Sequence, residues 1–171
     1  APAEVGPHAP YEPTREGGIK LIDVVSFECG DRGVLSVIGN LGFREPVRRA
    51  FWISGVARGA HRAGHAHRQT TQILVMTRGS ATVRGWGPSP TCYLPDLPIR
   101  EFAFELSEAT GKAAVVPPLH WLDLSDFSPD ALLLVLASTP YMENDYIRDR
   151  SDFNRILADM AGSVQRSQAN P

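Results

Sequence analysis

Short runs of apolar and β-branched residues, separated by frequent turn residues, make up most of this chain of 171 residues. Clear examples are "VLSVI" at 34–38, "QILVM" at 72–76 and "ALLLVLAS" at 131–138. The stretches between such runs do not carry the long helical patterns that a fold of alternating strands and helices requires. The pattern therefore predicts an all-β sandwich or barrel.

The remaining predicted strands are 19–27, 48–56, 80–86, 100–106, 113–117 and 120–124. The tripeptide "TRG" separates 72–76 from 80–86 and predicts a hairpin-like turn between these two strands. A Pro- and Gly-rich link at 87–98 precedes the next strand. All of these strands are expected to belong to one β domain.

A different pattern near the end of the chain predicts one amphipathic helix. In "SDFNRILADMAG", apolar residues recur at steps of three and four. Ser151 is expected to cap the start of this helix and Gly162 to end it. These apolar positions are Phe153, Ile156, Leu157 and Met160.

Composition divides the chain into three parts. Residues 1–17 are rich in Pro, Gly and Glu and are predicted to form a flexible arm. Residues 18–162 are expected to form a single domain with its C-terminal helix, and 163–171 a disordered tail.

Charge and hydropathy narrow the class of partner. The formal net charge of −2 argues against a nucleic-acid binder that works by counterion release. No window reaches the roughly 18 apolar residues of a membrane span, and the first residues lack the pattern of a signal peptide. We therefore expect a cytoplasmic protein that acts on a small molecule, with no nucleic-acid or membrane partner.

Three histidines gather in "GAHRAGHAHRQTTQILVMTRG" at 59–79, where His65 and His67 stand two residues apart. This pair comes just before the apolar run 72–76 and is assigned to the start of that strand. Side chains two apart in a strand point to the same face, so both imidazoles are expected to project together. The direction of His61 is not fixed by its sequence position.

Three interpretations of this stretch are open: a metal site, an acid/base pair and a polar loop. The spacing resembles the first cupin motif, but a glutamate normally stands where Gln72 stands, and a neutral amide is a poor ligand for a divalent cation. His120 also lies two residues too early for the usual third histidine ligand. The sequence favours proton transfer by the histidines without metal or other cofactor, since imidazole titrates near neutral pH.

The ordered set of motifs in the chain resembles the sugar-nucleotide 3,4-ketoisomerases of the cupin superfamily, which act on dTDP-4-keto-6-deoxyglucose. The resemblance runs from about Ile19 to Leu157. It is carried by the stretches "DRGVLSVI", "EPVRRAFWI", "RAGHAHRQTTQILVMTRGSATV", "VVPPLHWLDLSDFSPDALLLVLASTPY" and "NDYIRDRSDF".

The resemblance implies a cupin double-stranded β-helix (jelly-roll barrel) with a C-terminal α-helix. It also implies a metal-independent shift of a carbonyl group between C4 and C3 of a nucleotide-linked 6-deoxy sugar. Members of this family form homodimers, often with exchanged N-terminal strands, so a homodimer is expected here.

Matching the family pattern assigns candidate roles to single residues. His65 and His67 match its active-site histidines, and His65 is our candidate for the general base, although either ring could take the proton. Gln72 matches the family's glutamine and is expected to bind a sugar oxygen.

Arg49, Arg62 and Arg68 are candidates for binding a diphosphate, since Arg pairs with phosphate bidentately. Phe51, His120 and Trp121 complete the expected substrate-binding set, and Tyr141 and Tyr146 are interpreted as packing residues for the last helix.

One residue departs from the family pattern. The tyrosine that is thought to relay protons in the family is replaced by Phe51, whose ring cannot carry a proton. Another group, such as His61, His120, Tyr93 or a water, then takes over the relay. Alternatively, the chain is a diverged cyclase, tautomerase or epimerase for a non-nucleotide intermediate, or a binding protein without catalysis. Trp52, the next residue, is expected to face the opposite side of the strand.

Overall fold

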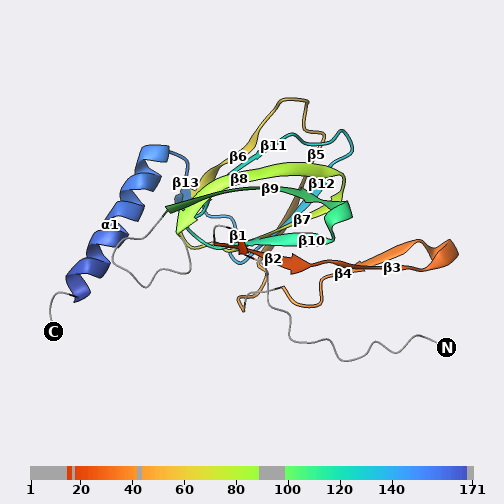
Figure 1. Cartoon of the computed structure of the whole chain (residues 1–171), viewed down its shortest axis with the longest axis horizontal. Coiled ribbons are helices and arrows are strands. Elements are labelled where there is room, and N and C mark those ends of the chain that lie inside the picture. Colours follow the sequence, from red (N-terminus) through yellow and green to blue (C-terminus); the bar gives the residue numbers. More distant parts are fainter. Residues whose placement is uncertain (1–14, 17, 42–43, 89–98, 169–171) are drawn as a thin grey trace.

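The computed structural model describes residues 15–16, 18–41, 44–88 and 99–168, which form two large β-sheets, a separate two-stranded sheet and one long helix (Figure 1). One sheet has six strands in the order β1-β2-β10-β7-β12-β5, and the other has five in the order β13-β6-β11-β8-β9. The strands are β1 Arg15–Glu16, β2 Ile19–Asp23, β3 Val25–Glu28, β4 Val34–Val37, β5 Arg49–Ser54, β6 Arg62–His67, β7 Gln72–Arg78, β8 Ser80–Pro88, β9 Ile99–Ser107, β10 Lys112–Val116, β11 Trp121–Ser125, β12 Leu132–Ala137 and β13 Tyr146–Ile147. The helices are the short 3-10 turns η1 Gly30–Arg32, η2 Glu108–Thr110 and η3 Glu143–Asp145, and α1 Arg150–Gln168.

The hydrophobic core lies between the two sheets. In β12, Leu133, Val135 and Ala137 are buried, whereas the residues between them are only half-buried, as expected when alternate side chains face opposite sides of a strand. The buried residues of β12 pack with side chains such as Leu74 of β7 and Val83 of β8 in one cluster. The predicted all-β fold with a C-terminal helix is confirmed.

Two strand assignments from the sequence were wrong in detail. The run 19–27 is not one strand, because β2 pairs with β10 in the barrel whereas β3 pairs only with β4. The strands β7 and β8 do not form a hairpin: they lie in different sheets, and the chain crosses between the sheets at Gly79. Gly79 has a φ of 71°, and a Cβ there would lie 2.1 Å from the hydroxyl oxygen of Ser128, so glycine is required at this crossing.

The hairpin of β3 and β4 extends away from the barrel, on the side opposite to α1 (Figure 1). Its cross-strand pairs include Val25 with Val37 and Phe27 with Leu35, and all four of these side chains are exposed. Alternation along the strands places them on one face of the hairpin, while Ser26 and Ser36 bond to each other on the other face. The hairpin therefore presents an exposed apolar face.

The C-terminal helix is confirmed, but its predicted limits were wrong. The carboxylate of Asp149, rather than the side chain of Ser151, caps the helix by accepting the backbone N–H of Asp152 at 2.9 Å. The helix also continues through Gly162 to Gln168. Its buried residues Phe153 and Leu157 pack on the barrel in a cluster with Trp121.

The two ends of the chain were predicted to be an arm at 1–17 and a tail at 163–171. Residues 1–14, 17 and 169–171 lie outside the described residues. Arg15 and Glu16 form β1, which pairs with β2, and residues 163–168 belong to α1. Within the described ranges, no helix is both long and apolar enough to cross a membrane.

Candidate active site

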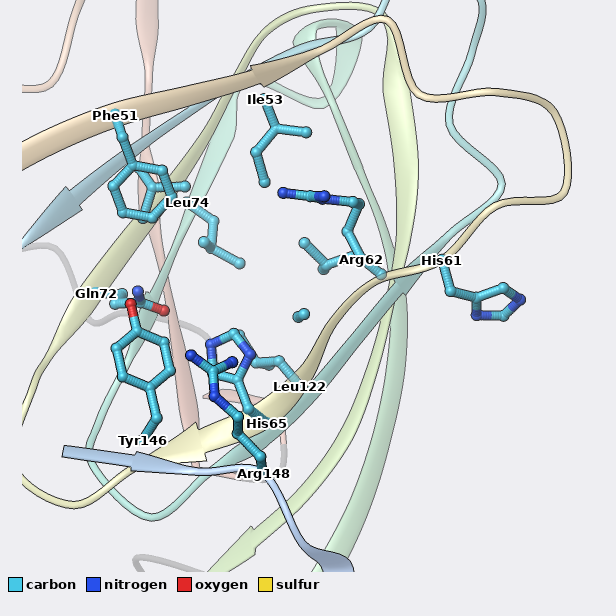
Figure 2. A pocket seen from close by; sticks show the side chains of 13 residues that line it. Phe51, Ile53, His61, Arg62, His65, Gln72, Leu74, Leu122, Tyr146 and Arg148 are labelled. Atoms are coloured by element: carbon cyan, nitrogen blue, oxygen red, sulfur yellow. The ribbon is translucent and has the colours of Figure 1, made fainter. Parts of the chain in front are cut away.

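A cavity of about 380 Å³ opens at one end of the barrel between the two sheets (Figure 2). Its wall combines apolar side chains from both sheets with two histidines, an amide, a phenol and two guanidinium groups. The lining residues are Phe51, Ile53, His61, Arg62, Ala63, His65, Gln72, Leu74, Leu122, Leu124, Val135, Tyr146 and Arg148.

The backbone of β6 positions the histidine motif at this cavity. The motif was assigned to the start of the strand at 72–76, but it forms the end of its own strand in the other sheet. Ala63 and Gly64 have φ angles of 65° and 69°, and the register of β6 against β11 shifts at this point. Such consecutive left-handed residues form a bulge, which sets the direction of the side chain that follows at His65.

His65 lies in the cavity wall and is half-buried. Removal from water is the main cause that lowers the pKa of this imidazole to about 4; a contact with the backbone of Ala63 opposes the shift, and the nearby His67, Arg148 and Arg49 add to it. No described residue makes a hydrogen bond to its Nδ1 atom. His65 is therefore neutral at neutral pH, and this unpaired Nδ1 atom is buried.

His67 lies behind His65 and is buried. The two rings meet edge to face, with centroids 5.1 Å apart, so the expectation that they project together is confirmed. The Nδ1 atom of His67 lies 2.8 Å from the carboxylate of Asp145. Burial lowers the pKa of His67, and the bond to Asp145 opposes this shift in part. His67 itself does not line the cavity.

Asp145 fixes the tautomer of His67. Its carboxylate accepts hydrogen bonds from the backbone N–H of Gln69 at 2.8 Å and from the hydroxyl of Thr70, in addition to His67. Burial raises the pKa of Asp145, but these hydrogen bonds outweigh it and hold the pKa below its ordinary value. Because the carboxylate is ionised, His67 donates its Nδ1 hydrogen and its Nε2 atom carries the lone pair.

Tyr146 was interpreted as a packing residue for the helix, and the structure places it in the cavity instead. It pairs with His67 across β13 and β6. Its ring centroid lies 4.9 Å from that of His65 and 4.4 Å from that of His67. Tyr141, in contrast, is 62% exposed and bonds to Glu143.

The cationic side chains at the cavity differ in part from the predicted set. Arg62 lines the cavity as expected, and Arg148, which was not predicted, lines it as well. The guanidinium of Arg148 lies 4.4 Å from the centre of the Tyr146 ring. Arg49 is outside the lining, with its guanidinium 5.4 Å from the ring of Phe51, and Arg68 is exposed.

Among the other predicted residues, Gln72 and Phe51 line the cavity, and Trp52 faces outward as expected, with 69% of its surface exposed. The structure does not bring His120 or Trp121 to the cavity. The His120 ring packs on the backbone of Gly18 and Gly87, and the Trp121 ring packs on Phe153 of α1.

Sequence reasoning missed Asp145, Tyr146 and Arg148 as site residues. All three come from the short segment "DYIRD" next to α1, which had been used only to support the family resemblance. A signal was present, because an acid, a phenol and a guanidinium within four residues is a combination that favours a functional site. What the sequence does not show is that β13 pairs with β6 and so brings this segment to the histidines.

Within the described residues, no group of three or more His, Cys, Asp and Glu side chains is arranged to hold a metal ion. Gln72, which stands where the first cupin motif normally has a glutamate, presents a neutral amide to the cavity. Metal independence stays a prediction.

The barrel, with one histidine in the wall of its cavity and a second in contact with it, has the architecture of a cupin-type domain. The model of the FdtA family, described as WxcM-like, C-terminal, matches residues 17–86 and 96–158, and the chain belongs to this family. A curated relative from Aneurinibacillus thermoaerophilus, TDP-4-oxo-6-deoxy-alpha-D-glucose-3,4-oxoisomerase, is 33% identical over 112 residues. That match covers 66% of this chain and 73% of the relative.

Solved structures agree with this family assignment. The sugar 3,4-ketoisomerase QdtA from Thermoanaerobacterium thermosaccharolyticum, in complex with TDP, is 27% identical with a TM-score of 0.68 over 83% of this chain and 96% of its own. A 3,4-ketoisomerase from Helicobacter canadensis is 26% identical with a TM-score of 0.64, covering 82% and 97% of the two chains. By family and fold, the protein is a cupin-type isomerase.

Proposed function

We propose that this protein moves the carbonyl group of a TDP-linked 4-keto-6-deoxy sugar from C4 to C3, with His65 and His67 as its acid/base pair. The observation that carries the proposal is the imidazole of His65 in the cavity wall, in contact with the buried pair of His67 and Asp145. The curated relative is a TDP-4-oxo-6-deoxy-glucose 3,4-oxoisomerase, and QdtA has been solved with TDP.

The reaction requires protons to move at two carbons and two oxygens. His65 takes the proton from C3, and the electron pair of that C–H bond forms a C3–C4 double bond while the C4 oxygen gains a proton. The resulting enediol then loses the hydroxyl proton at C3, and C4 receives a proton from the imidazolium. A neutral imidazole is the form that accepts the first proton, and burial keeps His65 in this form.

The pair of His67 and Asp145 supports His65 from behind. Asp145 holds the His67 ring in one tautomer and orientation. His67 in turn restrains the orientation of the His65 ring through their edge-to-face contact. Fixing the direction of a catalytic ring reduces the reorganisation that proton transfer requires. In this arrangement His67 either orients His65 or returns a proton to it.

Substrate binding is assigned to the polar groups of the cavity. Arg62 and Arg148 supply positive charge for the diphosphate, because a guanidinium forms paired hydrogen bonds with phosphate oxygens. Gln72, which is buried at the cavity, supplies an amide for a sugar oxygen. The predicted contributions of Arg49, His120 and Trp121 stay predictions, because these residues do not line the cavity.

A second candidate function is favoured by Phe51, whose apolar ring lines the cavity where the family has a tyrosine. A more apolar wall suits a carbonyl compound other than a sugar nucleotide, or binding without turnover. Either outcome would leave the fold and the histidine pair intact.

The test is conversion of TDP-4-keto-6-deoxyglucose, followed by NMR in deuterium oxide, with the variants His65→Asn and His67→Asn as controls. We expect a 3-keto product from the parent protein and losses of about 10²-fold or more in kcat in each variant. Stabilisation by TDP without conversion would favour the binding protein, and no thermal stabilisation at millimolar TDP would favour a non-nucleotide substrate. Metal analysis of the active protein tests the prediction of metal independence.

We also propose that the protein is a homodimer. The support is the hairpin of β3 and β4, whose apolar face is exposed in the single chain. A two-stranded hairpin is at best marginally stable on its own in water, and an exposed apolar face is stabilised by burial against another surface. A second copy of the chain is the partner that the family resemblance implies.

A further inference from the structure

We propose that the hydroxyl group of Tyr146 relays the hydroxyl proton between the C3 and C4 oxygens of the substrate, in the role that the side chain of Phe51 is unable to perform. This inference rests on the proposed isomerisation, and it adds a catalytic residue that sequence reasoning had assigned to packing. It also assigns a chemical role to the segment that joins the barrel to α1.

The reaction needs a group that is both a donor and an acceptor. When the C3–H bond breaks, the oxygen at C4 takes a proton. When the enediol collapses, the oxygen at C3 releases one. A hydroxyl placed between the two oxygens gives its proton to the first and takes one from the second, so that it ends in its starting form and no net proton is consumed.

Tyr146 is, within the described part of the chain, the single lining residue with a hydroxyl group. The guanidinium groups of Arg62 and Arg148 donate hydrogen bonds but do not give up a proton under ordinary conditions. The amide of Gln72 likewise binds oxygen atoms without transferring protons. His65 is engaged with the carbon-bound proton.

The hydroxyl of Tyr146 enters the cavity from the wall opposite to Phe51. Phe51 comes from β5 of one sheet, and Tyr146 comes from β13 at the edge of the other. Figure 2 shows the Tyr146 ring standing beside His65 with its hydroxyl end directed toward Phe51 and Gln72. Among the described residues the hydroxyl has no hydrogen-bond partner, so it is available to a substrate.

The position of Tyr146 is fixed by its surroundings. Its backbone pairs with that of His67, and the next residue, Ile147, is 2% exposed and packs in the cluster under α1. Its ring contacts both histidines, with centroid distances of 4.9 and 4.4 Å. A proton relay needs this kind of fixed placement, because misplacement by about 1 Å costs on the order of 10²-fold in rate.

The other groups considered for the relay are less well placed. The His61 ring is directed out of the cavity in Figure 2, where it pairs with Asp123 at 3.5 Å, and its side chain is 64% exposed. His120 packs against Gly18 and Gly87 and does not line the cavity. Tyr93 lies outside the described residues. These observations leave Tyr146 as the relay that the described site supplies.

The first test is Tyr146→Phe, which keeps the ring and its contacts and removes only the hydroxyl. We expect kcat to fall by about 10²-fold or more, while KM and the affinity for TDP change by less than about threefold. The matched control is Tyr141→Phe, which removes an exposed phenol five residues earlier, and we expect it to keep full activity. An active parent with a fully active Tyr146→Phe variant would overturn the relay and leave the proposed isomerisation standing.

The second test places a hydroxyl group at position 51, on the wall of the cavity formed by β5. In the Tyr146→Phe background, Phe51→Tyr should recover at least about tenfold in kcat, because a phenol from β5 again reaches the substrate oxygens. A purely structural role of Tyr146 predicts no such recovery, and its absence would contradict the relay.

A third measurement does not depend on the folding of Tyr146→Phe. Replacement of Tyr146 by 3-fluorotyrosine keeps the size of the ring and makes its phenol more acidic. The alkaline limb of the pH profile of kcat should then move to lower pH, and an unmoved limb would overturn the relay. If the unmodified protein does not convert the keto sugar at all, the proposed isomerisation itself is wrong.

Discussion

His67 and Asp145 are 78 residues apart in the sequence, yet the imidazole Nδ1 and a carboxylate oxygen meet at 2.8 Å in the interior of the protein. Their side chains are 6% and 2% exposed. This hydrogen bond joins the strand that carries the histidine motif to the segment that precedes the C-terminal helix. Through this contact, the segment before α1 holds the His67 ring beside that of His65.

We expect Asp145→Asn to lower kcat by about 10²-fold or more, because an amide does not hold His67 in a single tautomer. Loss of charged acceptors for Gln69 and Thr70 should also cost about 1–3 kcal/mol in the free energy of unfolding. Steady-state kinetics and thermal unfolding check both effects. Asp123→Asn, at the exposed partner of His61, is the matched control and should change neither quantity much.

The pKa of His65 predicts how stability depends on pH. This imidazole titrates at about 4 in the folded protein and near 6.5 when unfolded, so the unfolded state binds more protons between these values. Stability is therefore full above about pH 6.5 and falls as the pH drops toward about 4. We expect the slope of the free energy of unfolding against pH in this range to be lower in His65→Asn by up to about 1.4 kcal/mol per pH unit.

Chemical denaturation at several pH values measures this slope. Substitution of the exposed His61 by Asn is the control, and it should leave the slope unchanged. Equal slopes for the parent and for His65→Asn would show that His65 does not resist protonation in the folded state.

Arg148→Ala should weaken TDP binding by about 10- to 100-fold, because a hydrogen bond to a charged group contributes roughly 1.5–3 kcal/mol. The loss should shrink as salt rises, since Arg148 is exposed and its charge is screened. Isothermal titration calorimetry at two salt concentrations measures this. Arg155→Ala, at an exposed pair on α1, serves as the control, and an equal loss there would point to a nonspecific charge effect.

Alanine variants at two glycines distinguish the effect of backbone strain on stability from the effect of the bulge on activity. Gly64 and Gly55 have similar φ angles of 69° and 66°, and a Cβ at either position would have no neighbour within 4 Å. Alanine at either should cost about 1 kcal/mol in stability. Only Gly64→Ala should also lower kcat/KM, because it alters the bulge before His65. Similar activity of the two variants would contradict this role of the bulge.

The exposed face of the β3–β4 hairpin predicts the behaviour of a surface variant. Phe27 and Leu35 are cross-strand partners that are 44% and 56% exposed. Their joint change to Ser should convert the proposed dimer to a monomer in light scattering, because burial of their apolar surface drives association. Ser26→Ala with Ser36→Ala changes the opposite face and should leave the dimer intact.

Local patterns predicted most of the strands, because alternation and turn residues follow from the two-sided structure of each strand. They did not predict which strands pair. The sequence neighbours β7 and β8 lie in different sheets, and β6 is a strand of its own. Pairing depends on contacts between distant segments, which periodicity in a short window does not report.

The residues of the candidate site likewise include some that local motifs predicted and others that depend on strand pairing. His65, Gln72, Phe51 and Arg62 line the cavity as expected, because they lie in motifs with a recognisable spacing. Tyr146 and Arg148 were missed, since their role depends on the pairing of β13 with β6. His120 and Trp121 were also predicted at the site, and neither lines the cavity.

The strand β13 is only two residues long, and with its neighbours it contributes a carboxylate, a phenol and a guanidinium to the site. These three groups stand within four residues of one another in the sequence. A few substitutions in this one segment can therefore change the acid, the phenol and the cation of the candidate site together, while the pairing of the long strands stays as it is.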